Sequence, residues 1–128
     1  MSSSPAEPLR GASVLLVDDD DDLADVMRRA LQRQGYEVHR SRAGTDAIAS
    51  LARLSRLDAA VVDLVLPGVG GLEVVRGIRR AFPACRIVAV TGLGEPLMEE
   101  AFRGAGADVF LAKPVELAEL FEALAAPR

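Results

Sequence analysis

Residues 14–31 read VLLVDDDDDLADVMRRAL, and this stretch decides how the chain folds. Its first four residues are apolar and uninterrupted, as in a strand that is buried on both faces of a sheet. The residues after the acidic run recur at helical spacing and predict an amphipathic helix over residues 22–34. The apolar stripe of that helix consists of Leu23, Val26, Met27, Ala30 and Leu31. Five consecutive aspartates usually belong to a solvated tail, but these join a strand to a helix and need another explanation.

The composition describes one folded domain. The chain has 128 residues, of which 50% are hydrophobic and 27% charged, so it should be globular rather than disordered. Its apolar stretches are far shorter than the roughly 18 residues needed to cross a membrane. Residues 1–11 lack the apolar core of a signal peptide and indicate a short flexible leader. A net charge of −4 without a basic stripe disfavours direct nucleic acid binding. Cys85 cannot form an internal disulfide, so we expect it to be buried filler in a protein of the reducing cytoplasm.

Strand-like and helix-like segments alternate along the chain. We expect strands at residues 14–17, 36–41, 59–66, 86–91 and 108–112. We expect helices at residues 22–34, from an N-cap at Thr45 through Leu54, from Gly71 to just before Pro83, and at residues 95–103 and 115–124. This alternation predicts a five-stranded parallel sheet covered by helices on both faces. In such sheets the functional groups gather where the strands end and the chain leaves for a helix.

Polar residues stand at four of these strand ends. Asp18 and Asp19 follow the first strand, Asp63 lies near the end of the third, Thr91 ends the fourth, and Lys113 follows the fifth. Carboxylates packed together need a countercharge, and Mg²⁺ is a hard cation that takes few carboxylates and keeps waters and phosphate oxygens. A spare carboxylate can then attack phosphorus and become an aspartyl phosphate, while the metal and the lysine neutralise the phosphoryl oxygens. Thr91 can hydrogen-bond a further oxygen and report whether phosphate is present.

The chain resembles the receiver domain of two-component response regulators. The segments that carry the resemblance are VLLVDDDDDLADVMRRAL, VVDLVLPGVGGLEVVRGIR, VAVTG and GADVFLAKP. They extend over about residues 12–125 in the order and spacing of the family. The resemblance implies an α/β, flavodoxin-like, doubly wound (βα)5 domain at residues 12–126, with a parallel sheet of strand order 2-1-3-4-5.

The resemblance also implies a role for each residue of the strand ends. Asp63 would be the phosphoacceptor, and Asp18 and Asp19 would hold Mg²⁺, with Mn²⁺ as the alternative ion. The other roles that the resemblance implies are a backbone carbonyl ligand to the metal from Val65, a switch hydroxyl from Thr91, a phosphoryl-pairing ammonium from Lys113, a switch aromatic from Phe110, and a cis bond between Lys113 and Pro114.

By resemblance, the protein is a phosphorylation-activated signalling switch rather than an enzyme of metabolism. It would catalyse its own phosphorylation and slow dephosphorylation only. Its partners would be a sensor histidine kinase or a histidine phosphotransfer protein, and an unknown downstream effector. Neither nucleic acid nor a membrane is expected as a direct partner, and the domain is expected to be a cytoplasmic monomer or weak dimer. Val65 and Leu93 occupy positions that tune loss of the phosphoryl group, and because neither can hydrogen-bond a water, we expect slow self-dephosphorylation.

Two other functions share part of this pattern. A phosphohydrolase of the haloacid dehalogenase type would also use an aspartyl phosphate, but it places its nucleophile after the first strand and needs a cap insertion. A degenerate receiver would act only as a binding module, although none of the expected acidic, hydroxyl or ammonium groups is missing.

The remaining charged residues have structural interpretations. Asp20, Asp21 and Asp22 are expected to cap the helix and to favour its N-terminus electrostatically. His39 is expected at the sheet edge. A solvated helix face is expected from Arg76, Arg79 and Arg80.

Overall fold

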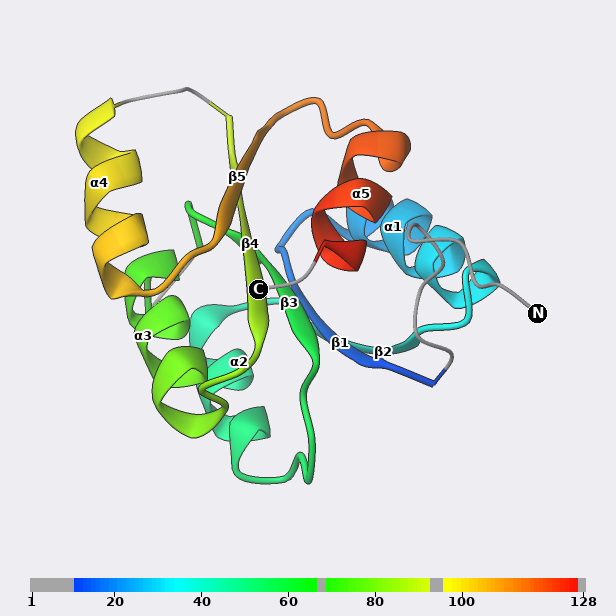
Figure 1. The fold of residues 1–128 in the computed structure, drawn as a ribbon, viewed down its shortest axis with the longest axis horizontal. Coiled ribbons are helices and arrows are strands. Elements are labelled where there is room, and N and C mark those ends of the chain that lie inside the picture. Colours follow the sequence, from blue (N-terminus) through cyan, green and yellow to red (C-terminus); the bar gives the residue numbers. More distant parts are fainter. Residues whose placement is uncertain (1–10, 67–68, 93–95, 127–128) are drawn as a thin grey trace.

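The computed structural model describes residues 11–66, 69–92 and 96–126, which form a three-layered α/β domain (Figure 1). All pairs of neighbouring strands run parallel, and the strand order is β2-β1-β3-β4-β5. The strands are β1 (Ser13–Val17), β2 (Glu37–Ser41), β3 (Ala59–Asp63), β4 (Arg86–Thr91) and β5 (Val109–Ala112). The helices are α1 (Asp21–Arg33), α2 (Gly44–Leu51), α3 (Gly71–Ala81), α4 (Pro96–Ala105) and α5 (Leu117–Ala125). The predicted fold class is confirmed. The leader predicted for residues 1–11 lies almost entirely outside the described residues.

The central strands are buried on both faces because helices cover both sides of the sheet. Helices α2, α3 and α4 lie on one side, and α1 and α5 on the other (Figure 1). Alternate residues of β1 face these two layers: Leu15 and Val17 pack with the first group of helices, and Val14 and Leu16 with the second. All four are fully buried, which explains why the strand is an unbroken apolar run.

The register of the sheet brings the polar strand ends to one edge. Val17 of β1 pairs with Val62 of β3, so Asp18 and Asp63 follow paired residues and leave the sheet side by side. On the other side of β3, Asp63 pairs with Val90, the residue before Thr91. The backbone N–H of Lys113 donates to the carbonyl of Thr91 at 2.8 Å, which fixes the fifth strand end beside the fourth.

Helix α1 begins and ends within one residue of its predicted bounds. The side chain of Asp20 accepts a hydrogen bond from the N–H of Leu23 at 3.1 Å, which satisfies one of the unpaired donors of the first turn. Asp21 and Asp22 lie in that turn, where negative charge is favoured. After the helix, Gly35 has a φ of +98°, a backbone conformation that glycine adopts without strain.

Two elements, α2 and β3, differ from their predicted bounds. Helix α2 begins at Gly44 after an Ala43 N-cap, not after Thr45, and it ends at Leu51. A Cβ atom at Gly44 would lie 1.9 Å from the carbonyl oxygen of Val69, so close approach of the chain after β3 decides which residue stands at this helix start. Strand β3 ends at Asp63 rather than at residue 66, because the Asp63 carboxylate accepts the N–H of Val65 at 2.9 Å and turns the chain.

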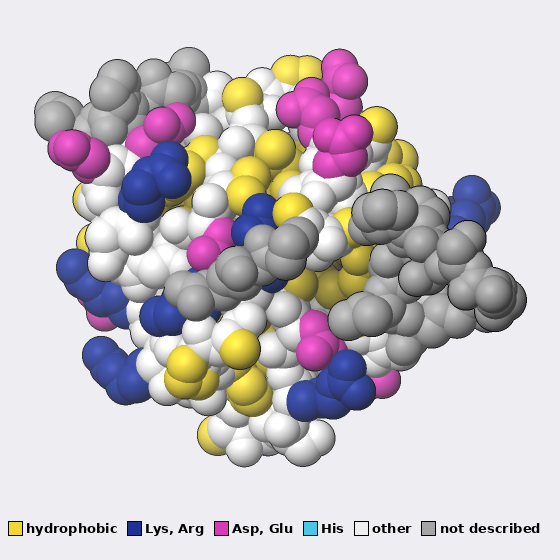
Figure 2. All heavy atoms as spheres, viewed as in Figure 1, with side chains coloured by type: hydrophobic (Ala, Val, Ile, Leu, Met, Phe, Trp, Pro, Cys, Tyr) yellow, Lys and Arg dark blue, Asp and Glu magenta, His cyan; other side chains and the backbone are white. Residues whose placement is uncertain are grey.

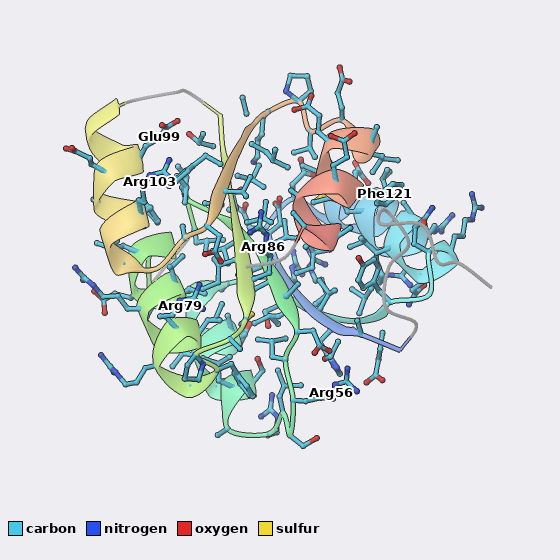
Figure 3. The ribbon with its side chains drawn as sticks, in the orientation of Figure 1. Arg56, Arg79, Arg86, Glu99, Arg103 and Phe121 are labelled. Carbon is cyan, nitrogen blue, oxygen red and sulfur yellow. The ribbon has the colours of Figure 1, made fainter. Side chains whose placement is uncertain are left out.

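The prediction that Arg79 belongs to a solvated helix face is wrong, because its side chain is only 17% exposed. Its guanidinium donates to the carbonyls of Pro83, Cys85 and Gly106 at 2.9, 2.7 and 2.6 Å. It also pairs with the Asp108 carboxylate at 3.0 Å, and the side chains of this ion pair are 17% and 15% exposed. Arg79 therefore fastens α3 to the start of β4 and to the segment between α4 and β5 (Figure 3). Its neighbours Arg76 and Arg80 are exposed, as expected.

The positions of Cys85 and His39 and the lengths of the helices agree with the sequence. Cys85 is buried within the core, as predicted. His39 lies on the edge strand β2, where its ring contacts the Glu37 carboxylate at 3.2 Å. None of the helices in the described ranges is long and apolar enough to span a membrane.

Replacing Arg79 should cost considerable stability. In Arg79→Ala, three carbonyl groups and the half-buried Asp108 carboxylate lose their cationic partner, and we expect a loss of about 3 kcal/mol in the free energy of unfolding. Urea denaturation followed by circular dichroism measures this change. Arg80→Ala, one position along the same helix and exposed, is the matched control and should change stability by less than about 0.5 kcal/mol. Equal effects of the two substitutions would contradict the role of Arg79.

Candidate functional site at the carboxyl edge of the sheet

Three carboxylates meet at the carboxyl edge of the sheet. Asp18 and Asp19 follow β1, and Asp63 is the last residue of β3. One carboxylate oxygen from each residue lies within 4.8 Å of the others. Asp18 and Asp63 are 2% and 3% exposed, whereas Asp19 is exposed. The register of the two buried strands produces this crowding, as the sequence predicted.

One ammonium group enters the same cluster. Lys113 Nζ lies 2.8 Å from Asp63 Oδ2, while Asp63 Oδ1 accepts the N–H of Val65. The bond between Lys113 and Pro114 is cis, as predicted. Thr91 ends β4 and is half-buried at the same edge. The structure thus brings all the predicted strand-end groups together.

The electrostatics of the cluster leave an excess of negative charge. Burial raises the pKa of Asp18, the hydrogen bond from the N–H of Asp20 at 2.8 Å opposes that rise, and the charge of Asp63 adds to it. Burial lowers the pKa of Lys113, but the hydrogen bond and charge of Asp63, with the charges of Asp18 and Asp19, outweigh burial and leave this pKa raised. Three carboxylates therefore face one firmly protonated ammonium, an all-oxygen donor set that suits a small divalent cation such as Mg²⁺.

The predicted switch aromatic lies on β5 beside α4. Phe110 is half-buried and packs against the cluster formed by α2, α3 and α4. The Arg103 guanidinium carbon lies 4.9 Å from the centroid of its ring, a distance at which cation and ring attract each other. Glu99 and Arg103 project from successive turns of α4 (Figure 3). The sequence prediction did not include this contact, because spacing along α4 does not say which strand residue a side chain meets.

Acidic side chains gather where α5 begins. Glu116 and Glu119 are exposed at this helix start, and acidic groups cluster over the same end of the molecule in the space-filling view (Figure 2). Helix α5 contains no lysine or arginine. The charged side chains of α5 are therefore all acidic, whereas α4 brings Arg103 to the other side of β5.

The sequence analysis did not predict that Arg40 of β2 and Arg42, just after it, lie beside the site. Arg40 donates to the backbone carbonyl of Asp18 from Nη2 at 2.8 Å and from Nε at 3.3 Å. The two oxygens of the Asp21 carboxylate pair with Arg40 at 2.9 Å and with Arg42 at 3.0 Å. Two arginines separated by one residue at a strand end point to the same side, which is the signal that could have suggested a shared partner.

Comparison with known proteins agrees with this geometry. Among solved structures, a response regulator from Burkholderia pseudomallei, crystallised with a phosphorylated aspartic acid, a calcium ion and citrate, superposes with a TM-score of 0.82. It is 29% identical, and the match covers 88% of this chain and 66% of that one. This chain therefore has the same type of α/β fold as that response regulator.

Sequence comparison gives the family. Residues 14–125 match the model of the response regulator receiver domain. Response regulator MprA of Mycobacterium leprae is 37% identical over 107 residues, which are 84% of this chain and 46% of that protein. A cyclic di-GMP phosphodiesterase of Thermotoga maritima is 37% identical over 106 residues, 82% of this chain and 28% of that protein. The chain belongs to the response regulator receiver domain family, whose members are phosphorylation-dependent switches, and it spans less than half the length of these two relatives.

The buried charge of Asp18 should lower the stability of the metal-free protein. Asp18→Asn keeps an oxygen that can accept the Asp20 N–H but removes a buried charge, so the metal-free variant should be more stable at neutral pH. We expect its thermal midpoint to rise by about 2–5 °C. The raised pKa of Asp18 means that the folded wild-type protein binds this proton more tightly than the unfolded chain does. The difference between the two proteins should therefore shrink as the pH falls through the pKa of Asp18.

Differential scanning calorimetry in the presence of a chelator, at neutral pH and at pH values approaching the ordinary carboxyl range, measures this difference. A variant that is less stable than the wild-type protein at neutral pH would contradict the assignment of Asp18 as a destabilising charge.

Proposed function

We propose that Asp63 accepts a phosphoryl group from a phosphorylated histidine of a sensor kinase or a phosphotransfer protein. The observation that carries this proposal is the position of Asp63, whose carboxylate lies 2.8 Å from Lys113 Nζ and within 4.8 Å of both Asp18 and Asp19. A buried carboxylate that lies close to an ammonium and to two further carboxylates has the surroundings that phosphoryl transfer needs.

The transfer is a displacement at phosphorus. An oxygen of Asp63 forms the new P–O bond as the P–N bond to the donor histidine breaks, and the imidazole nitrogen leaves with the bonding electrons. Lys113, already paired with Asp63, lies where it can pair with a phosphoryl oxygen once the acyl phosphate has formed. Thr91, at the end of the neighbouring strand, offers a hydroxyl group to a further oxygen.

A divalent cation completes the site. Asp18, Asp19, Asp63 and the backbone carbonyl of Val65 would hold it, and Mg²⁺, with Mn²⁺ as the alternative, fits this oxygen donor set. When bound, it supplies positive charge that offsets the carboxylates and the phosphoryl oxygens. The crowding of Asp18, Asp19 and Asp63 around one ammonium supports this part of the proposal.

Phosphorylation would act on a partner by changing the shape of the surface around Phe110. A Thr91 hydroxyl drawn toward the phosphoryl group would free space near Phe110, two residues along β5 from the residue that pairs with Thr91. The altered surface, formed by α4, β5 and α5, would then regulate a partner or an output domain. In this proposal residues 12–126 are the receiver unit, residues 1–11 a leader, and the protein is a cytoplasmic monomer or weak dimer that binds neither nucleic acid nor membrane directly and turns over no metabolite.

Phosphorylation by a small donor tests the acceptor. Incubation with acetyl phosphate and Mg²⁺ should add one phosphoryl group, detected as a mass increase in intact-protein mass spectrometry. Asp63→Asn should incorporate none, because the amide cannot act as the nucleophile. Asp19→Ala should fold but should require far more Mg²⁺ or fail to react.

Each alternative function has its own outcome in this experiment. Absence of any Asp63-dependent incorporation would favour a receiver that acts only as a binding module. Continuous release of phosphate from small phosphate esters would favour a phosphohydrolase.

The phosphorylated protein should persist for many minutes or longer. The side chain of Val65 is 76% exposed and carries no group that could orient an attacking water, so hydrolysis lacks a general base or a positioned hydrogen bond there. Leu93, the other position that led to this prediction, lies outside the described residues. Removing acetyl phosphate by rapid desalting and following the loss of the added mass measures the lifetime. A lifetime of seconds would contradict the prediction, and Val65→Glu or Val65→Asn, which add a polar group, should shorten it.

A further inference from the structure

The backbone of the acidic loop is held from the neighbouring strand β2. Arg40 reaches from β2 and donates two hydrogen bonds to the carbonyl oxygen of Asp18. Among the described residues no other donor reaches that carbonyl. Because this oxygen belongs to the peptide that joins Asp18 to Asp19, the guanidinium of Arg40 fixes the plane of that peptide and the direction in which the chain leaves β1.

Asp19 depends on that backbone more than Asp18 does. The Asp18 carboxylate is buried and accepts the N–H of Asp20 at 2.8 Å. The Asp19 carboxylate is exposed, and within the described part of the chain no hydrogen bond or ion pair restrains it. Its place beside Asp18 and Asp63 therefore follows from the orientation of its own backbone.

Asp21 in turn holds Arg40. One oxygen of its carboxylate lies 2.9 Å from Arg40 Nη2, and the other lies 3.0 Å from Arg42 Nη2. The Arg40 side chain is 23% exposed, so this pairing is screened less than a fully exposed one. Asp21 also offsets two positive charges near a cluster that has to attract a cation.

We propose that Arg40 is a positioning residue for the metal site, which orients the Asp18–Asp19 peptide and is itself held by Asp21. The inference rests on the proposed metal site and adds to it a support that lies outside the ligands. Besides metal binding and helix capping, it gives the acidic run a third role, because Asp21 acts on the site by holding Arg40 and contacts no metal ligand itself.

A positioning role and a purely electrostatic role of Arg40 predict opposite changes in Mg²⁺ affinity when its side chain is removed. Removing a positive charge near a cation site should tighten cation binding if charge were the main effect. If Arg40 orients the peptide that carries Asp19, its removal should weaken binding, and losing a group that supports metal ligands typically costs 10–100-fold in affinity. The sign of the change therefore identifies the mechanism.

Calorimetric titration of the unphosphorylated protein with MgCl₂ is the test, since the chain contains no tryptophan to report binding by fluorescence. Arg40→Ala should raise the Kd for Mg²⁺ about tenfold. Arg40→Lys retains the charge but not the planar fork, so it should recover part of the affinity. With acetyl phosphate, Arg40→Ala should need more Mg²⁺ for half-maximal rate, while its rate at saturating Mg²⁺ stays within about threefold of wild type.

Arg42→Ala is the matched control. It removes a cation that pairs with the same Asp21 carboxylate but makes no contact with the Asp18 carbonyl, so the Kd should change by less than about twofold. Asp21→Asn should weaken Mg²⁺ binding in the wild-type background and add little in the Arg40→Ala background, because Asp21 acts through Arg40. If Arg40→Ala proves unstable in thermal unfolding, Asp21→Asn and Arg40→Lys still give the same readout in folded protein.

The outcomes separate this inference from the proposed function. If the wild-type protein binds no Mg²⁺, the proposed metal site fails and the inference fails with it. If the wild-type protein binds Mg²⁺ and Arg40→Ala binds it equally well or more tightly, only the positioning role is overturned.

Discussion

The parallel pairing of β1 with β3 is the constraint on which the rest of the structure depends. Both strands are buried on both faces, so neither can shift its register without exposing apolar side chains or burying polar ones. The carboxylates that follow paired residues of these strands must then share one edge. Helices α1 and α3 begin directly beyond that edge, and β4 and β5 add Thr91 and Lys113 to it in the same direction.

This constraint crowds carboxylates together at a cost to the stability of the folded protein. Burial and the charge of Asp63 both raise the pKa of Asp18, and Lys113 is the one ammonium that the structure places against Asp63 among the described residues. A domain built for stability alone would replace such a cluster by neutral or apolar groups. The instability is local and is offset by the apolar layers on both sides of the sheet, which leaves the cluster able to gain free energy from a ligand.

The sequence predicted the parts of the molecule that follow from periodicity and local order. The unbroken apolar run at residues 14–17 identified a strand buried on both faces, and the order of strands and helices placed Asp18, Asp63 and Lys113 at one edge. Local capping by Asp20 was equally predictable, because donor and acceptor are only three residues apart. In each case the partners are close in sequence, or the topology leaves one arrangement.

What the sequence did not predict depends on contacts between distant segments. The start of α2 is decided by a backbone oxygen of Val69 that passes Gly44, and no rule of capping includes that neighbour. Arg79 seemed to belong to an exposed helix face until the fold placed Asp108 and the Gly106 carbonyl within its reach. The sequence analysis gave Arg40 no role, since its partner Asp18, directly after β1, is 22 residues away in the sequence.

The position of Arg79 has a mechanical consequence for α4. Its guanidinium donates to the Gly106 carbonyl and pairs with the Asp108 carboxylate, just after α4 ends. Phe102, near the end of that helix, is 2% exposed. These contacts hold the carboxyl-terminal end of α4, and the helix itself begins at Pro96, five residues after Thr91. A ten-residue helix is about 15 Å long, so any rotation of α4 about this held end would displace the start of the helix most.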